Sequence, residues 1–284
     1  MIMVKAHAKI NVALNIDENK LANGYHNIDS IMLPLELHDR IEFEFLPAYF
    51  DTMITCDDVS IPTDESNLIV KAFNVMKERF GFKQSFRIHV HKIIPISAGL
   101  GGGSADAAAV INTLIKMLKL KVSEEELIEI AKKVGSDVPY CLFNKPSRCK
   151  GIGEKLEPIS IKNKYHVLLI KPKTGMSTAE AYKKYDEIKE KEFSNIEVLI
   201  EALKKGDEEK IASEMKNGLE KPTMNEIVQV REIKEQLIKD GFKMAMMSGS
   251  GSTVFAMSKS LKELQKEAQK FENKGHYIKI TNIL

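Results

Sequence analysis

Four glycines stand within five consecutive positions in the stretch Gly99-Leu100-Gly101-Gly102-Gly103-Ser104-Ala105-Asp106. Glycine loses more backbone freedom on folding than any other residue, so such a stretch is used where the backbone must adopt left-handed angles or approach something closely. The chemistry that it suits is phosphate binding, because the N–H groups of a helix N-terminus then face the anion. The alternative interpretation is a tight turn with close helix packing.

The segments on both sides of the glycines are those that a phosphate-binding loop needs. Upstream, apolar residues at 86, 88 and 90 alternate with polar ones, which predicts a strand with one buried face. Downstream, an apolar stripe predicts a helix that Ser104 could cap. The stripe consists of Ala107, Ile111, Leu114, Ile115 and Leu118. The stretch lacks the Gly-Lys-Ser/Thr end of a Walker A motif and the third glycine of a dinucleotide fingerprint, so it predicts a phosphate loop of another kind.

Three more residues stand where they could take part in chemistry. Lys9 lies within a period-two apolar pattern that predicts a strand over residues 1–16, Asp137 precedes the apolar run 138–143, and His26 follows Tyr25 and an Asn-Gly turn signal. Each has an ordinary alternative, which is a solvent-facing lysine, a helix-capping aspartate or a surface turn histidine. These segments taken singly leave both interpretations open.

The composition excludes several classes of protein. The chain has 284 residues, 43% of them hydrophobic, and a formal net charge of +2, so no excess of basic residues recruits nucleic acid or an acidic membrane surface. No apolar run approaches the ~20 residues that span a bilayer, and the N-terminus has no signal-peptide pattern. The three cysteines, Cys56, Cys141 and Cys149, form no CxxC motif and fit a reduced compartment. We therefore expect a cytoplasmic protein.

The order of the predicted elements indicates an α+β protein of two domains. Strands are expected over 30–37 and 40–46, and a helix begins near Ser66 or Asn67 and leads to the strand before the glycine loop. The pattern breaks at Lys171-Pro172, so we place a domain boundary there, between a first domain of residues 1–170 and a second of residues 171–284. Helices and strands mixed through the second half favour an α+β sandwich.

Five motifs, taken in chain order, resemble the GHMP small-molecule kinases over essentially the whole chain. They are Lys9-Ile10-Asn11, Gly24-Tyr25-His26, the segment 95–109, Gly135-Ser136-Asp137-Val138-Pro139 and Ser248-Gly249-Ser250-Gly251. The resemblance implies an α+β fold of two domains with the active site in the cleft between them. It also implies a kinase that transfers a phosphoryl group from ATP, accompanied by Mg²⁺, to an alcohol. Gly-Tyr-His and Gly-x-Asp-Val-Pro point to the branch that acts on a cytidine diphosphate-linked sugar alcohol in non-mevalonate isoprenoid precursor biosynthesis.

The same resemblance implies roles for individual residues. In the catalytic pair, Asp137 would orient the substrate hydroxyl and accept its proton while Lys9 stabilises the negative charge. Asn67 and Lys92 match positions near the adenosine moiety. The ATP phosphates would be held by Pro95, Ile96, Ser97, Ala98, Gly99, Leu100, Gly101, Gly102, Gly103, Ser104 and Ala105.

The acceptor would be held by residues of two of these motifs and of a predicted helix that Ser177 opens. Tyr25 and Tyr182 would sandwich the cytosine, and His26 would recognise the edge of the base. Asn11 and Thr178 would help to place the methylerythritol. The Ser104 hydroxyl is best placed to approach Mg²⁺, but no protein metal ligand is predicted.

Two positions depart from the family pattern, and two other functions compete with this one. Asn23 stands where Asp is common and Ser252 where Pro is common, which weakens any statement about exact loop shape. One competing function is a GHMP kinase acting on homoserine or mevalonate. The other is a catalytically silent nucleotide sensor. We expect a monomer or a homodimer that binds small molecules and no nucleic acid.

Overall fold

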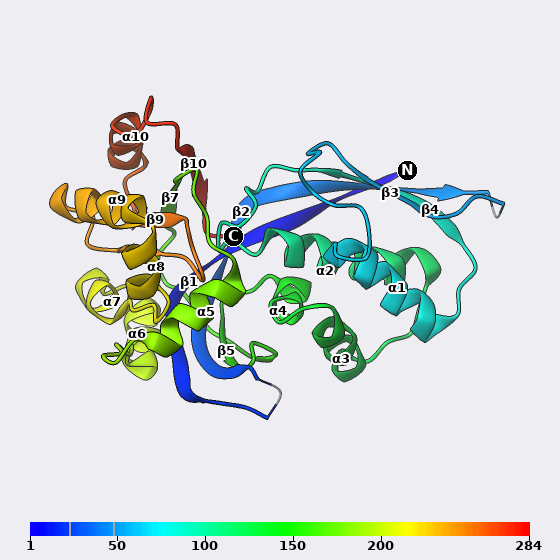
Figure 1. The fold of residues 1–284 in the computed structure, drawn as a ribbon, viewed down its shortest axis with the longest axis horizontal. Coiled ribbons are helices and arrows are strands. Elements are labelled where there is room, and N and C mark those ends of the chain that lie inside the picture. The colour runs from blue at the N-terminus through cyan, green and yellow to red at the C-terminus, as the bar shows by residue number, and fades with distance from the viewer. Residues whose placement is uncertain (23, 48) are drawn as a thin grey trace. The chain divides into compact units, whose positions relative to one another are not determined.

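A computed structural model describes residues 1–22, 24–47 and 49–284, so the predicted turn position Asn23 lies outside the described residues (Figure 1). The chain folds into mixed helices and strands, which confirms the α+β class, and divides into two compact units. The first unit comprises Met1–Ala8, Leu37–Ile96 and Gly101–Asn144, and the second comprises Lys9–Glu36, Ser97–Leu100 and Lys145–Leu284.

The bounds of these units differ from the predicted domains 1–170 and 171–284 because two long strands contribute to both units. Strand β1 (Ile2–Lys20) pairs with strand β2 (His26–Leu46). The division at residue 170 remains a prediction about domains.

Strand β2 is continuous where the sequence predicted two strands, over 30–37 and 40–46. The prediction of a break was wrong because Asp39, a polar residue inside the apolar pattern, is fully buried as part of the strand. Its carboxylate accepts a hydrogen bond from the backbone N–H of Ile94 at 2.8 Å. A polar residue can therefore lie inside a buried strand when backbone N–H groups satisfy its carboxylate. The polarity of Asp39 alone was not a signal that the strand ends.

Helices cover one face of the strands of the first unit (Figure 1). The alternation of buried residues at 86, 88 and 90 confirms the predicted strand, which pairs antiparallel with the C-terminal half of β2 and parallel with β3. Ser123 caps the helix that follows it, Glu124–Val134, by accepting from the N–H of Glu126. The elements of this unit besides β1 and β2 are β3 (Met53–Cys56), α1 (Leu68–Phe80), β4 (Ser85–His91), α2 (Gly102–Leu118), α3 (Glu124–Val134) and α4 (Val138–Phe143).

The second unit is built on an antiparallel sheet of strand order β10-β7-β9-β8. Helices α9 and α10 pack on this sheet, and Leu14 and Ile16 of β1 join its buried core. A β5–β6 hairpin pairs with the N-terminal half of β2. The elements are β5 (Ser147–Gly151), β6 (Lys155–Pro158), β7 (His166–Lys171), α5 (Thr178–Glu187), α6 (Ile196–Lys205), α7 (Glu208–Glu214), α8 (Glu220–Glu226), α9 (Val228–Lys239), β8 (Ala245–Met247), β9 (Val254–Ser258), α10 (Leu261–Gln269) and β10 (Tyr277–Asn282).

Over the residues that the structure describes, we find no helix with both the length and the apolar character needed to cross a membrane.

Candidate active site

In the first unit, the glycine-rich stretch runs directly into helix α2. Gly101 is the N-cap residue and adopts a left-handed conformation with φ of 70°. Ser104 is therefore the third residue of the helix, and the prediction that it caps the helix was wrong. A glycine cap provides no side-chain acceptor for the N–H groups of the first turn, so these donors can bind an anion.

Lys92 lies beneath this first turn, held between two carboxylates. Its ammonium donates to Asp39 and, at 2.8 Å, to Asp106, and all three side chains are almost completely buried. A Cβ atom on Gly102 would lie 3.0 Å from Nζ of Lys92, so the absence of a side chain at residue 102 lets the helix start directly above the charge. Lys92 was predicted to lie near the adenosine moiety, and its contacts here tie β4 to the start of α2.

The two carboxylates and one ammonium shift one another's proton affinities. Burial raises the pKa of Asp106 to about 7, and the nearby Lys92 only partly offsets this. Burial by itself would lower the pKa of Lys92, but Asp106 and Asp39 outweigh it and hold the pKa above the ordinary value. The lysine therefore stays charged, whereas Asp106 shares its site with a second carboxylate.

Asn67 is the N-cap of α1, as the sequence predicted. Its side-chain oxygen accepts from the N–H of Ile69 at 2.8 Å, and its amide nitrogen donates to the carbonyl of Pro62 at 2.7 Å. The contacts of this side chain are thus local ones that begin the helix. Its assignment to the adenosine site remains a prediction.

Asp137 occupies the N-cap position of α4, which has Pro139 in its first turn. Every residue of this helix is described, and the Asp137 side chain makes no capping hydrogen bond. The alternative interpretation therefore gave the right position in the helix, but the carboxylate does not act as the cap. The residue is half-buried and carries an acidic side chain on a rigid element, as a base for a substrate hydroxyl requires.

In the second unit, Lys9 lies in a segment of β1, residues 8–14, that is buried on both faces. Its ammonium donates to the side-chain oxygen of Asn11 at 2.7 Å, and only 4% of the residue is exposed. The predicted surface alternative for Lys9 is therefore wrong. The backbone N–H of Lys9 donates to the carbonyl of Leu100 at 3.0 Å, which joins β1 to the first half of the glycine-rich stretch.

The loop 97–100 and the turn 248–251 are packed backbone against backbone. A Cβ on Gly99 would lie 1.9 Å from the carbonyl oxygen of Ser248, and Ser248 Oγ donates to the carbonyl of Gly99 at 2.9 Å. A Cβ on Gly249 would lie 3.3 Å from Nζ of Lys9. These glycines allow the loop, the turn and the Lys9 ammonium to meet in one place, a close approach that side chains would prevent.

Two more side chains fix this turn. Asn217, which sequence analysis did not single out, donates to the carbonyls of Met247 and Gly249, both at 2.8 Å. Thr178, predicted to place the acceptor, lies 3.1 Å from the hydroxyl of Ser250. The structure therefore gathers Lys9, Asn11, Gly99 and Thr178 around one turn of the second unit.

The predicted base-binding residues lie elsewhere in this unit. The rings of His26 and Tyr182 are stacked with centroids 5.8 Å apart, and His26 is buried whereas Tyr25 is 57% exposed. His26 Nδ1 donates to the carbonyl of Asp17 at 2.6 Å, and Nε2 lies 2.9 Å from Oδ1 of Asp186. These contacts fix the imidazole ring against helix α5.

Asp186 was not identified from the sequence, although it follows Tyr182 by four residues on α5 and so shares its face. Partial burial would raise the pKa of Asp186, but its contacts with Lys20 and His26 outweigh burial and hold the pKa below the ordinary value. The ionised carboxylate therefore anchors His26 to the helix that carries Tyr182.

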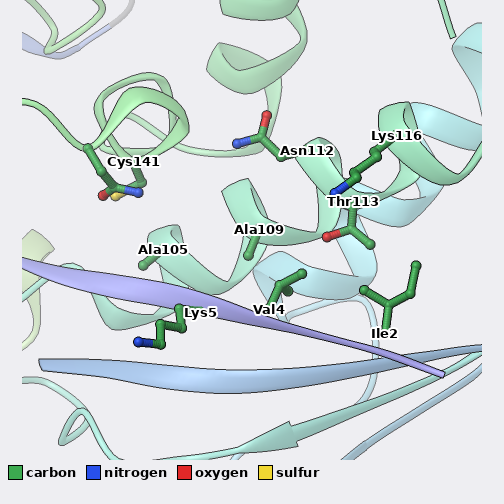
Figure 2. A pocket seen from close by; sticks show the side chains of 10 residues that line it. Ile2, Val4, Lys5, Ala105, Ala109, Asn112, Thr113, Lys116 and Cys141 are labelled. Atoms are coloured by element: carbon green, nitrogen blue, oxygen red, sulfur yellow. The ribbon is translucent and has the colours of Figure 1, made fainter. Parts of the chain in front are cut away.

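A cavity of about 170 Å³ lies in the first unit between the start of β1 and helices α2 and α4 (Figure 2). Ala105 and Ala109 lie on the α2 side of it, Val4 lies on β1, and Cys141 projects from α4. The small side chains of α2 leave this space open. The cavity thus adjoins the first turn of the helix that begins at the glycine-rich stretch.

Known proteins match the chain over most of its length. The profile of the GHMP kinases N terminal domain matches residues 67–145, and that of the GHMP kinases C terminal matches residues 199–276. A 4-diphosphocytidyl-2-C-methyl-D-erythritol kinase of Thermoanaerobacter pseudethanolicus is 41% identical over 93% of this chain and 90% of its own. The chain belongs to the GHMP kinase family. A relative of the same name from Clostridium beijerinckii is 42% identical over 89% of this chain and 90% of its own.

Solved structures of GHMP kinases have a fold similar to that of this chain. A crystal structure of a 4-(cytidine 5'-diphospho)-2C-methyl-D-erythritol kinase superposes with a TM-score of 0.80, at 25% identity over 99% of both chains. Homoserine kinase from Cytophaga hutchinsonii has a TM-score of 0.78 at 19% identity over 100% of this chain and 94% of its own, which shows the shared fold alone. As a GHMP kinase, the chain is an enzyme that phosphorylates a small molecule with ATP as donor.

Proposed function

We propose that this enzyme transfers the γ-phosphoryl group of ATP to a hydroxyl of 4-diphosphocytidyl-2-C-methyl-D-erythritol, giving the 2-phosphate and ADP. The reaction is a step of isoprenoid precursor biosynthesis by the non-mevalonate pathway. The observation that carries the proposal is the near full-length likeness, at about 40% identity, to relatives that bear the name of this kinase. The buried His26 beside Tyr182 supports it, because a homoserine or mevalonate kinase has no base to bind.

The ATP phosphates are bound by the residues from Pro95 to Ala105. The uncapped first turn of α2 supplies backbone donors and the positive end of the helix dipole. Asn67 and Lys92 complete the nucleotide site in this proposal. The burial of Lys92 against Asp39 and Asp106 supports an indirect role, in which it holds the loop that contacts the phosphates.

Asp137 and Lys9 carry the chemistry. Phosphoryl transfer needs positioning and charge stabilisation rather than covalent help from the protein. Asp137 orients the acceptor hydroxyl and takes its proton as the oxygen bonds to phosphorus, and Lys9 stabilises the negative charge that develops. The burial of the Lys9 ammonium supports this role, because a charge acts more strongly where water is excluded.

Mg²⁺ fits this site as a metal that arrives with the nucleotide. Among the residues described, no three His, Cys, Asp or Glu side chains are grouped to hold a metal. The Ser104 hydroxyl in the first turn of α2 is the protein group that would approach it. Such sparse protein ligation is usual for Mg²⁺ bound to phosphates, where the metal neutralises charge on the transferred group.

The acceptor is held by side chains of the second unit. Tyr25 and Tyr182 stack on the cytosine, and His26 recognises the edge of the base. Thr178 and Asn11 place the methylerythritol. The exposure of Tyr25 supports a ligand-stacking role, because a ring that served only the core would be buried.

A panel of acceptors tests the proposal by ADP release. The purified enzyme is assayed with ATP and Mg²⁺ on the diphosphocytidyl alcohol, homoserine and mevalonate in parallel. We expect turnover on the first acceptor alone. Turnover on homoserine or mevalonate with none on the diphosphocytidyl alcohol would assign another GHMP kinase activity, and ATP binding without turnover on any acceptor would favour a nucleotide sensor.

We propose a cytoplasmic location for this enzyme, and the three cysteine side chains, all described and all outside any disulfide, support it. A monomer or a homodimer is the oligomeric state that we propose.

A further inference from the structure

The side chain of Asn11 connects Lys9 to a serine that has no role in the function proposed above. Asn11 Oδ1 accepts from the Lys9 ammonium at 2.7 Å, and Asn11 Nδ2 donates to Ser30 Oγ at 2.9 Å. Ser30 Oγ in turn donates to the carbonyl of Ala13 at 2.6 Å. The chain of hydrogen bonds therefore runs from the ammonium to the backbone of β1.

This chain of hydrogen bonds has one workable direction. The Lys9 ammonium can only donate, so the oxygen of the Asn11 amide must face it and the nitrogen must face Ser30. Because the single hydroxyl proton of Ser30 is given to Ala13, the Ser30 oxygen is left to accept from Asn11. A rotated amide would place N–H groups against the ammonium and would cost Ser30 its bond to Ala13.

Because these side chains are buried, the orientation of the Asn11 amide has a large effect on their hydrogen bonding. The exposed fractions of Lys9, Asn11 and Ser30 are 4%, 1% and 0%, so water cannot replace a lost partner. An unsatisfied buried donor carries its full desolvation penalty, and the surrounding groups move to relieve it. The group that would move is the side-chain amide of Asn11, which holds the Lys9 ammonium in place.

We propose that Ser30 is a positioning residue for phosphoryl transfer, which orients the Asn11 amide and through it the Lys9 ammonium. This inference rests on the role proposed above for Lys9. It also assigns Asn11 a duty besides acceptor binding, since its oxygen and one of its N–H groups are engaged by protein atoms. Ser30 contacts no reacting atom in this proposal and acts only through Asn11.

A double-mutant cycle on kcat tests the coupling of Ser30 to Asn11. Ser30→Ala removes the acceptor for Asn11 Nδ2, and we expect kcat to fall about ten-fold with the KM for ATP changed less than about two-fold, as misplacement of a catalytic group predicts. In the Asn11→Ala background the same substitution should cause no further fall, because the amide that Ser30 orients is gone. Ser30→Thr keeps the hydroxyl on a strand and should restore kcat.

Two further variants control for structural damage. Ser147 is also almost fully buried, and its hydroxyl donates to the nearby carbonyl of Lys145, so Ser147→Ala should leave kcat unchanged. Ser30→Cys replaces Ser30→Ala if the latter does not fold, since a thiol has nearly the same size and accepts hydrogen bonds poorly. Circular dichroism and binding of a fluorescent ATP analogue confirm that each assayed variant is folded.

The inference is overturned by an unchanged kcat in Ser30→Ala, or by an equal loss of kcat from Ser30→Ala in the wild-type and Asn11→Ala backgrounds. Failure of the proposed function gives a different result. The cycle is run on whichever acceptor the wild-type enzyme phosphorylates, so a wrong acceptor leaves it intact. Full turnover in Lys9→Ala would overturn the role of Lys9. If Lys9→Ala is inactive but the effects of Ser30→Ala and Asn11→Ala on kcat are additive, only the role of Ser30 is overturned.

Discussion

The side chains of Lys9 and Lys92 are both buried, and different groups hold them. Lys92 bonds to two carboxylates, which raise its pKa and bind it to its own unit. Lys9 donates to the amide oxygen of Asn11, and this hydrogen bond orients its ammonium. At the scale of the residue, Lys92 thus links β4 to α2, whereas Lys9 is oriented by a residue of its own strand for the role in charge stabilisation that we propose.

Asp137→Ala should remove most turnover while ATP binding persists. The carboxylate is proposed to act on the acceptor hydroxyl, and general-base contributions are typically 10²- to 10⁴-fold. Steady-state ADP release and titration with a fluorescent ATP analogue measure the two effects. Asp240→Ala is the matched control, since this aspartate bonds to Gln236 and Lys270 on the surface. Turnover in Asp137→Ala equal to that of Asp240→Ala would contradict the assignment.

His26→Ala should chiefly raise the KM for the acceptor, by about ten-fold or more, because hydrogen bonds to a base edge are worth about 1–3 kcal/mol each. The KM for ATP should stay near its wild-type value. Initial rates over a range of acceptor concentrations measure the effect. His166→Ala controls for loss of an imidazole, since His166 bonds to Asn282 on the sheet of the second unit. An unaltered acceptor KM in His26→Ala would refute recognition of the base by His26.

At the scale of the element, helix α2 shows how a loop is fixed by what surrounds it. The sequence predicted the strand, the loop and the helix in the right order, because apolar periodicity and glycine content are local signals. The cap was placed at Ser104 instead of Gly101, because a left-handed glycine can begin a helix without a side-chain acceptor. Because Gly101 has no side chain to accept from the N–H groups of the first turn, these groups can bind an anion.

Gly99→Ala should be much more damaging than Gly81→Ala, although both glycines have positive φ, of 71° and 62°. At Gly99 the new Cβ would lie 1.9 Å from a backbone oxygen, which no rotamer change relieves, whereas at Gly81 nothing lies within 4 Å. We expect the Gly81 variant to lose about 1 kcal/mol, the strain of a left-handed alanine.

The Gly99 variant should lose more than about 3 kcal/mol, as clashes inside a packed interior do, together with most ATP turnover. Urea unfolding of both variants measures the difference in the free energy of unfolding. If both variants lose the same free energy of unfolding, the loop 97–100 does not pack closely on the turn 248–251 in solution.

The contacts that complete the candidate site join residues far apart in the chain, and the sequence could not reveal them. Asn217 belongs to none of the sequence motifs, yet it holds the turn at 247–249. Ser30 lies inside a predicted strand, and only the pairing of β1 with β2 brings it to Asn11. Lys9, Asp137 and the glycine loop could be proposed from the sequence because each belongs to a short motif, whereas the residues that support them follow from tertiary packing.

At the scale of the whole molecule, the two carboxylates beside Lys92 make stability depend on pH. The folded pKa of Asp106 is about 7, above its ordinary value of 3.8. The folded state thus keeps a proton that the unfolded state releases, so the free energy of unfolding falls as pH rises from about 4 to about 7 and levels off above that. Asp106→Asn should flatten this slope in thermal unfolding measured between pH 4 and 8.

Asp58→Asn provides a control of opposite sign. Hydrogen bonds from Ser60 lower the pKa of Asp58, so its contribution to stability is present at neutral pH and is lost only as the pH falls towards the lowered pKa. The slope between pH 4 and 7 should therefore be unaffected in that variant. An unchanged slope in Asp106→Asn would mean that Asp106 is ionised throughout the range.

The division of β1 and β2 between the two units has a consequence for biosynthesis. Every residue of the first unit has been added to the growing chain by Asn144, whereas the second unit includes Lys9–Glu36 and yet requires Lys145–Leu284. The N–H of Leu284 donates to the carbonyl of Pro34 at 2.9 Å. The strand segments that carry Lys9 and His26 therefore leave the ribosome early and obtain their final neighbours only once Lys145–Leu284 have been synthesised, so a nascent chain that ends at Asn144 should show no ATP turnover.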